Sequence, residues 1–153
     1  MWRTKNGETV VDRHNSHLHD GVSAVLPEAL LRIDPMGKDF LVEEVSFPEV
    51  IGETTCVATE AGDDVVFAQR LKRFGLTRFV KGKSPEPCKS IVVILKKVEN
   101  GYVLITAFIG HKAEPEPWDR NATPASKEFW STHALVWGSE EIIPGTETDI
   151  CPW

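Results

Sequence analysis

The chain has 153 residues, a length that suits one domain with one core, and 41% hydrophobic with 26% charged residues is ordinary for a globular protein. No hydrophobic run approaches the ~18 residues that cross a bilayer, and the first residues lack the apolar stretch of a signal peptide. We therefore expect a single globular domain over residues 1–153, a cytoplasmic location and no association with a membrane.

The net charge of −6 argues weakly against a nucleic-acid partner, but the charges are unevenly distributed. Nine basic residues and one acidic residue fall between Arg70 and Lys97, whereas the rest of the chain holds eight basic and 22 acidic residues. The cluster of basic residues produces a local positive field that attracts phosphate groups, while the rest of the surface stays acidic and soluble. RNA is therefore a candidate partner. The alternative is that these basic residues occupy the outward-facing positions of strands and simply face water.

Cysteine usage excludes two classes of small protein. The three cysteines are odd in number, and none forms a Cys-x-x-Cys pair, which argues against a disulfide framework and a zinc ribbon. We expect Cys56 to be a small buried strand residue, and Cys88 and Cys151 to lie in loops. We expect no cofactor.

The chain opens with a polar leader, residues 1–20, that is rich in histidine. An apolar stripe then runs from Val22 to Ile33 at helical spacing, which predicts the first helix. Asp20 is a suitable N-cap, but Pro27 is awkward inside a helix, so the helix begins either at Asp20 or at Pro27. The turn at residues 34–37 ends it.

Several runs with strand character follow, and the clearest are two neighbours near the middle of the chain. Residues 90–98 and 102–109 are rich in β-branched side chains, and Asn100-Gly101 between them is a strong hairpin signal. We expect this pair to form adjacent central strands of an antiparallel sheet. The other expected strands are residues 40–47, 54–59, 65–70 and 76–80.

A second helix is predicted near the end of the chain, with Thr123 as N-cap and Pro124 in its first turn. Its apolar stripe is Phe129, Trp130, His133 and Trp137, and residues 144–153 are expected to form a frayed tail. The order helix, strands, helix predicts an α+β fold: an antiparallel sheet of about five or six strands, with an N-terminal and a C-terminal helix packed on it.

Three histidines of the leader are candidates for acid–base chemistry or metal binding. In an extended segment, alternation puts His17 and His19 on one side, and His-x-His is a frequent metal-ligand spacing. Imidazole is also the natural general acid or base at neutral pH. The alternative is an exposed polar leader. A metal-dependent hydrolase using His14, His17 and His19 is therefore one hypothesis.

Two further residues interrupt the pattern of their strands. Thr106 lies in an otherwise apolar strand, where its hydroxyl is able to orient a phosphate or to serve simply as a good strand residue. Arg78 alternates with Leu76 and Val80 but departs from their apolar character, and its planar fork matches phosphate. Weaker candidates are His111, which follows the strand of Thr106, and His133, which is expected to pack as a core histidine beside Phe129.

The layout resembles the small RNases and toxin domains grouped with barnase, EndoU, colicin E5 and RelE. Members of that group have an N-terminal helical part followed by a four-stranded antiparallel sheet, and many carry histidine in the first part. The residues that support the resemblance are the β-branched run 91–95, Gly101 and the segment 102–108 that ends in Ile-Thr-Ala-Phe. It covers residues 17–110 at most.

The resemblance implies a metal-independent endoribonuclease or RNA-processing domain. His17 or His19 would act as general base or acid, Thr106 would bind the scissile phosphate, and Arg78 or a nearby lysine would stabilise the phosphorane. Arg70, Lys81 and Lys83 are the predicted RNA-binding residues, and a protein partner of the antitoxin or immunity type is an expected further partner. The alternative is a non-catalytic module that binds RNA or another acidic partner, with Trp118 and Trp130 lining a pocket or packing in the core.

Overall fold

A computed structural model describes residues 1–12, 18 and 20–153 of the chain. Contacts between residues cluster in two compact units, each built from two stretches of chain. Unit 1 comprises residues 1–54 and 87–112, and unit 2 comprises residues 55–86 and 113–153. This division is compatible with one domain made of two units and with two separate domains. The single domain over residues 1–153 therefore stays a prediction. No helix in the described ranges is long and apolar enough to span a membrane.

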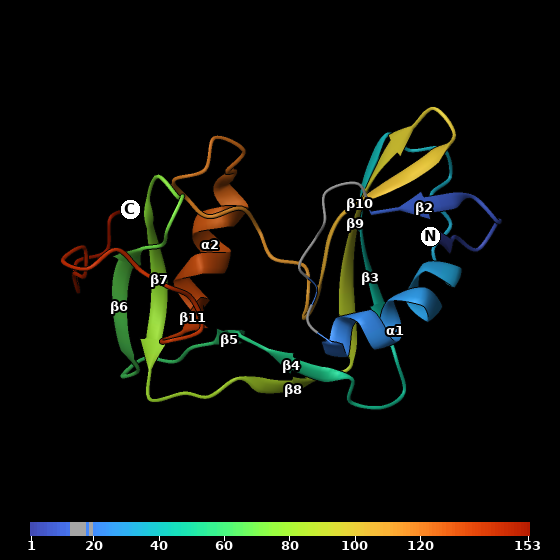
Figure 1. Ribbon diagram of the computed structural model, residues 1–153. Helices are drawn as coiled ribbons and strands as arrows, with labels where there is room; N and C mark the ends of the chain where they lie inside the picture. The colour runs from blue at the N-terminus through green and yellow to red at the C-terminus, as the bar shows by residue number, and fades with distance from the viewer. Residues whose placement is uncertain (13–17, 19) are drawn as a thin grey trace. The chain divides into compact units, whose positions relative to one another are not determined.

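Unit 1 is built around a five-stranded sheet, whose strands are ordered β1-β2-β10-β9-β3 (Figure 1). The strands are β1 (Trp2–Arg3), β2 (Thr9–Val11), β3 (Phe40–Ser46), β9 (Ser90–Val98) and β10 (Gly101–Ile109). All neighbours are antiparallel except β2 and β10, which run parallel. A separate two-stranded sheet pairs β4 (Gly52–Thr54) with β8 (Glu86–Cys88). The β9–β10 pairing confirms the predicted central hairpin.

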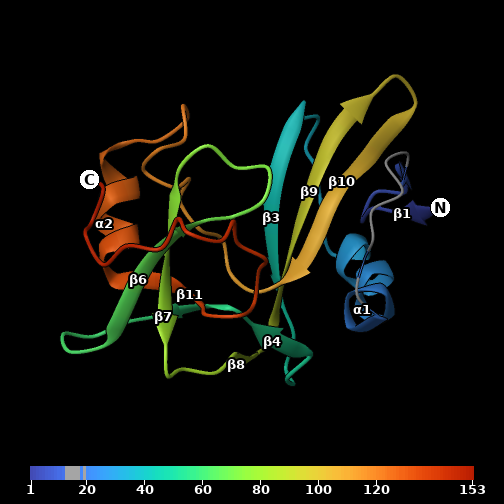
Figure 2. The same cartoon turned by 60° about the vertical axis from the view of Figure 1, so that its left-hand side comes forward.

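One face of this sheet carries the core of unit 1, and helix α1 (Asp20–Leu31) covers it (Figure 2). The helix buries Val22, Leu26, Ala29 and Leu30, the predicted apolar stripe, against alternate residues of β3, β9 and β10. The helix begins at Asp20 and continues through Pro27. The proline removes one backbone donor, and the burial of this stripe offsets that loss.

Unit 2 contains a four-stranded sheet ordered β5-β11-β7-β6. Its strands are β5 (Cys56–Ala58), β6 (Asp64–Gln69), β7 (Leu76–Lys81) and β11 (His133–Val136), and β11 runs parallel to β7. Phe79 at its centre is fully buried and packs edge-on against Trp137 at 5.6 Å between ring centroids. Helix α2 (Pro124–Thr132) begins after Thr123 as predicted.

The predicted sheet is wrong in two respects, although the coarse class, mixed helix and strand with two helices, is confirmed. The described strands form three sheets rather than one, and the two larger sheets each contain a parallel pair. Strand-like runs in a sequence reveal where strands lie but not which strands pair. Pairs such as Tyr102 with Val10 join residues that are far apart along the chain.

Two segment boundaries also differ from the predictions, and part of the polar leader belongs to the fold, because β1 and β2 extend the sheet of unit 1. The second helix ends at Thr132, and His133–Val136 form a strand because they pair with both β5 and β7. The expected frayed tail is tied to β6: Thr148 exchanges two backbone hydrogen bonds with Phe67, at 2.7 and 2.8 Å.

Candidate functional site

The face of the unit 1 sheet that lies away from α1 gathers most of the polar side chains of β3, β9 and β10. Strand side chains alternate between faces, and Leu41, Val45, Ile91 and Leu104 point into the core under α1. The residues between them occupy the other face. They lie in rows across the three strands: Val42, Ile94 and Thr106 in one row, Glu44, Val92 and Phe108 in the next, then Ser46 and Ser90.

Glu44 and His111 form a hydrogen-bonded pair at the edge of this face. We call the face that lies away from α1 the open face, although Val92 within it is buried. His111 Nδ1 lies 2.8 Å from Glu44 Oε2, and the second carboxylate oxygen accepts a hydrogen bond from the Lys112 amide at 2.8 Å. Gly110 makes the approach possible, because its φ of +151° is a conformation that side-chain-bearing residues rarely adopt. The imidazole is 61% exposed, so its ring remains accessible from solvent.

The carboxylate of Glu44 is held in its charged form. Burial raises the pKa of Glu44, but the hydrogen bonds from His111 and the Lys112 amide outweigh it, so the pKa lies below its ordinary value of 4.5. A charged Glu44 fixes the proton of a neutral His111 on Nδ1 and leaves Nε2 as the basic atom. The pair therefore has the properties of an acid–base group.

This arrangement gives a prediction for stability against pH. Since the pKa of Glu44 is lower in the folded chain than in the unfolded chain, its carboxylate stabilises the fold at neutral pH. That contribution disappears as the pH falls through the lowered pKa. We expect the urea midpoint of the wild-type protein to fall more steeply on acidification than that of Glu44→Gln. Parallel curves for the two proteins would contradict the assigned ion pair.

Cys88 lies on the other side of the His111 ring. Its Sγ is 3.7 Å from His111 Nε2, and it also contacts the Ser90 amide and carbonyl at 3.5 Å. Cys88 is 3% exposed, so the thiol is covered while the imidazole above it is open. The thiol of Cys88, the imidazole of His111 and the carboxylate of Glu44 thus follow one another, an order in which the imidazole can activate a cysteine as a nucleophile.

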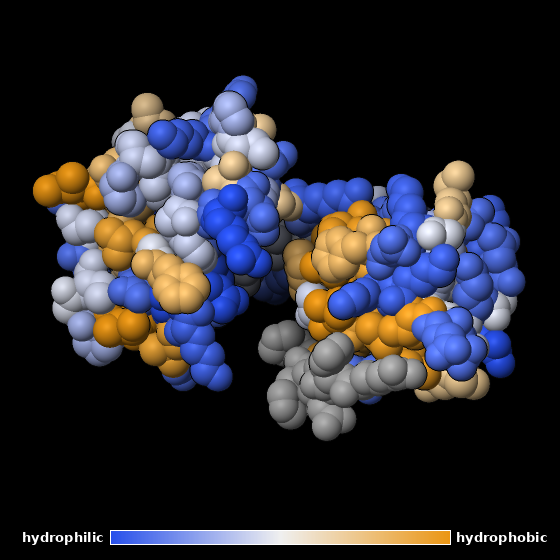
Figure 3. All heavy atoms as spheres, turned by 90° about the horizontal axis from the view of Figure 1, so that it is seen from above, coloured by the Kyte–Doolittle hydropathy of each residue, from blue (hydrophilic) through white to orange (hydrophobic). Residues whose placement is uncertain are grey.

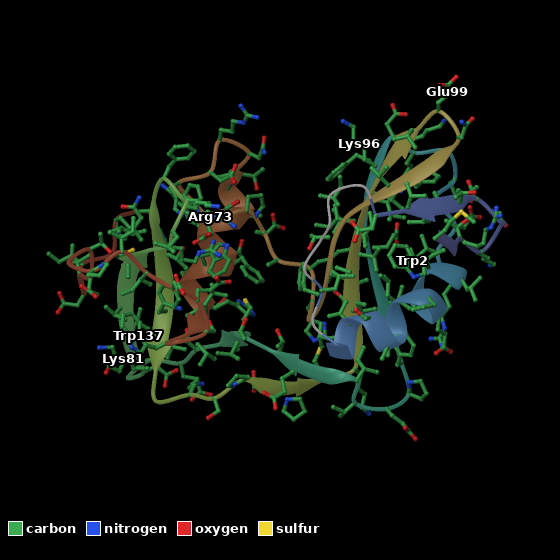
Figure 4. The ribbon with its side chains drawn as sticks, viewed as in Figure 1. Trp2, Arg73, Lys81, Lys96, Glu99 and Trp137 are labelled. Carbon is green, nitrogen blue, oxygen red and sulfur yellow. The ribbon has the colours of Figure 1, made fainter. Side chains whose placement is uncertain are left out.

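The predicted phosphate-binding threonine lies on the same face as this pair. Thr106 is half-buried and sits opposite Ile94, just after a bulge that shifts the register between Leu104 and Thr106. Lys96, labelled in Figure 4, continues the same face along β9 and is exposed. The open face thus combines a threonine, a lysine and an acid–base pair within one unit.

The predicted arginine and the predicted RNA-binding residues all belong to unit 2, so the structure does not unite them with Thr106 in one unit. Arg78 Nη1 donates to Thr59 Oγ1 at 2.8 Å and to the His133 carbonyl at 3.0 Å. Its predicted role on a phosphorane stays a prediction. Burial lowers the pKa of the Arg78 guanidinium, while the nearby Cys151 and Asp63 act in the opposite direction.

Three predicted RNA-binding residues of unit 2 have partners within the protein. Arg70 donates to Thr77 Oγ1 at 3.0 Å and forms a short ion pair with the buried Glu116. Lys83 Nζ lies 3.4 Å from Asp63 Oδ2, and Lys81 Nζ lies 4.8 Å from the ring centre of Trp137, a contact visible in Figure 4. These contacts engage the cations and leave less of their charge for RNA.

The other predicted residues fall in two groups. His14, His17 and His19 lie outside the described residues, so both their catalytic and their metal-binding roles stay predictions. His133 is half-buried and stacks on Phe129 at 4.1 Å between ring centroids, which confirms that it packs with that residue. Across residues 1–12, 18 and 20–153, no cluster of three or more histidine, cysteine or acidic side chains is suited to a metal ion.

The two tryptophans considered for a site have different surroundings. Trp118 packs on Gly75, where an added Cβ would lie 2.1 Å from Trp118 Cγ, so it is a packing residue of unit 2. Trp130 is 5% exposed and donates from Nε1 to the Glu114 carbonyl at 2.8 Å, and it also lines a cavity.

Glu44 was missed by the sequence analysis, although a signal for it existed. It belongs to a Glu-Glu pair inside an otherwise apolar strand, and an acidic residue of that kind is uncommon on a packed sheet. His111 was a loop candidate, and only the register of β3 against β9 brings Glu44 to it across 67 positions.

Comparison with known proteins gives no relative from which a function might be transferred. No family model, curated protein or solved structure matches the chain.

Proposed function

We propose that the protein is a metal-independent endoribonuclease, or RNA-processing enzyme, whose site is the open face of unit 1. The observation that supports this most directly is the 2.8 Å pairing of His111 with Glu44 on the face that also carries Thr106. Cleavage of RNA through its own 2′-hydroxyl needs a proton acceptor, a proton donor and groups that stabilise charge on phosphorus. The open face offers members of each class.

In the proposed reaction, His111 Nε2 removes the proton from the ribose 2′-hydroxyl, whose oxygen attacks the adjacent phosphorus. The bond from phosphorus to the 5′-oxygen breaks, and a protonated imidazole returns a proton to that leaving oxygen. The products are a 2′,3′-cyclic phosphate and a 5′-hydroxyl. Thr106 contacts the oxygens of this phosphate as negative charge builds up, and Lys96, which lies further along β9, contacts a neighbouring phosphate of the RNA. His17 or His19 remains the proposed second proton-transfer group.

The aromatic side chains of the open face support RNA as the substrate. Phe40 is 57% exposed and Phe108 is 41% exposed, and both alternate with the core residues of their strands, which places them on this face. Figure 3 shows hydrophobic side chains reaching the surface among hydrophilic ones. Exposed rings beside a lysine suit the stacking of unpaired bases, so single-stranded RNA is the proposed substrate.

The direct test is incubation of purified protein with fluorescent single-stranded RNA in the presence of a chelator. We expect cleavage to a cyclic phosphate end, and no cleavage of a DNA copy or of RNA with a 2′-methoxy group at every position, since the attacking hydroxyl is then absent. RNA that binds with strong salt dependence but is not cleaved would favour the non-catalytic binding module instead.

A second candidate function follows from the 3.7 Å approach of Cys88 Sγ to His111 Nε2. With Glu44 behind the imidazole, these groups could serve a thiol-dependent acyl-transfer enzyme, in which the cysteine attacks a carbonyl carbon. We rank it second because Cys88 is 3% exposed, whereas a nucleophile must reach its substrate.

Cys88→Ser separates the two candidates, because a ribonuclease uses the imidazole rather than the thiol. We expect this variant to retain RNA cleavage within about tenfold. If Cys88→Ser lost as much RNA cleavage as His111→Gln while its melting temperature stayed unchanged, the thiol enzyme would be favoured instead.

A further inference from the structure

A cavity that lies wholly within unit 2 is lined by aromatic side chains and one arginine. It has a volume of about 280 Å³ and lies on the side of the sheet that faces α2. Its walls come from three elements and the C-terminal segment: Phe67 of β6, Arg78 of β7, Trp130 and Ser131 of α2, with Cys151 and Trp153. All of them belong to unit 2.

Arg78 is held in this wall without a carboxylate partner. Its guanidinium donates two hydrogen bonds from Nη1 to described residues, one to a hydroxyl and one to a carbonyl oxygen. Within the described ranges, no carboxylate lies within ion-pair distance of Arg78, in contrast to Arg70 and Lys83. Asp63 acts on the guanidinium only from beyond ion-pair distance, so an anion placed directly beside this half-buried cation would still be stabilised.

The aromatic walls are held by contacts within unit 2. Trp153 packs edge-on against Phe67 with 5.3 Å between ring centroids, and the Nε1 of Trp130 is held by the Glu114 carbonyl. Rings that are already ordered lose little entropy when a planar ligand stacks on them. Indole rings also provide the stacking surface on which proteins bind single bases.

We infer that this cavity, here called the Arg78 pocket, binds one nucleotide unit, with its phosphate on Arg78 and its base against the tryptophans. The volume fits a single nucleotide, since it is near the ~300 Å³ lower end of small-molecule sites. The inference rests on the proposed function, for which it supplies an RNA-gripping subsite in unit 2. It gives Arg78 a binding role that is separate from the chemistry of the open face.

Binding of nucleoside monophosphates to the full chain tests the Arg78 pocket. Calorimetric titration with AMP and UMP should give saturable binding, at least about tenfold tighter than binding of adenosine, which lacks the phosphate, or of inorganic phosphate, which lacks the base. Arg78→Gln should weaken AMP binding by about 10- to 100-fold, because it removes the charged donor. Arg73→Gln is the matched control, since Arg73 is exposed and lies outside the pocket.

Equal affinities for AMP and adenosine, or an Arg78→Gln variant that binds as well as the wild type, would overturn the inference. Arg78 also bonds to Thr59 and His133, so the substitution removes structural contacts as well, and a second measurement that needs no variant separates the two effects. In the wild-type protein, AMP should shift the indole N–H resonances of Trp130 and Trp153 and leave His111 unchanged. Shifts confined to His111 would equally reject the pocket.

The same reagents distinguish failure of this inference from failure of the proposed function. If RNA is not cleaved but AMP binding depends on Arg78, the ribonuclease proposal fails and the pocket stands. If RNA is cleaved with His111 required and AMP does not bind, the pocket fails alone. If both hold, Arg78→Gln should raise the KM for RNA at least about tenfold while kcat stays within about threefold.

Discussion

Replacing His111 by glutamine should lower the rate of RNA cleavage by about 100- to 10,000-fold, the usual contribution of a positioned general acid or base. Glutamine keeps the polarity and approximate size of imidazole but does not exchange a proton at neutral pH. The measurement is single-turnover cleavage of a fluorescent RNA with enzyme in excess, so that product release does not limit the rate.

Two controls make this result specific to the proposed chemistry. His133→Gln removes a histidine that stacks on Phe129 in unit 2 and should leave the rate within about threefold. Glu44→Gln should lower the rate less than His111→Gln and should shift its pH dependence, because Glu44 acts through the imidazole. If His111→Gln cleaves RNA as fast as His133→Gln, His111 has no part in the reaction and the proposal must be abandoned.

The largest expected effect on stability concerns the buried ion pair of unit 2. Glu116 and Arg70 have side chains that are 9% and 15% exposed, so neither is well solvated, and Glu116 Oε1 makes no hydrogen bond to any described residue. Glu116→Ala leaves the guanidinium with only the exposed carboxylate of Glu140, at 3.8 Å, which costs about 3 kcal/mol of unfolding free energy. Hydrogen exchange should show lost protection in residues 55–86 and 113–153.

Glu140→Ala is the matched control for that prediction. Glu140 also faces Arg70, but its carboxylate is 3.8 Å from Nη1 and its side chain is 48% exposed. Exposed pairs contribute about 0–1 kcal/mol, so this variant should keep nearly all of its stability. Similar losses in the two variants, or a loss of protection confined to residues 87–112, would show that the Glu116 pair does not stabilise unit 2.

The elements that the sequence predicted well are those with local causes. The β9–β10 hairpin follows from Asn100-Gly101 between β-branched runs, and the first helix follows from an apolar stripe at 3.6-residue spacing. The start of the second helix follows from Thr123 and Pro124. Turn chemistry, capping and periodicity depend on a few neighbouring residues, so they can be read without the fold.

The features that were missed depend on contacts between distant residues. His133 and Trp137 continue the apolar spacing of the second helix, yet His133–Val136 form a strand because two other strands flank them. Tertiary pairing here overrides a local pattern. The acid–base pair was missed for a similar reason, because the unusual position of Glu44 in an apolar strand does not reveal its partner until the sheet brings it to His111.

The order of strands in unit 2 has a consequence for how the protein is made. Strand β11 lies between β5 and β7 in the sheet, but it is the last of the four strands to leave the ribosome. About 50 residues separate it from the end of β7 along the chain. Folding during synthesis follows the order in which segments emerge. Until β11 arrives, both flanking strands present unpaired backbone edges, which are templates for wrong pairing. We therefore expect stalled or truncated chains that end before residue 133 to aggregate or to engage chaperones.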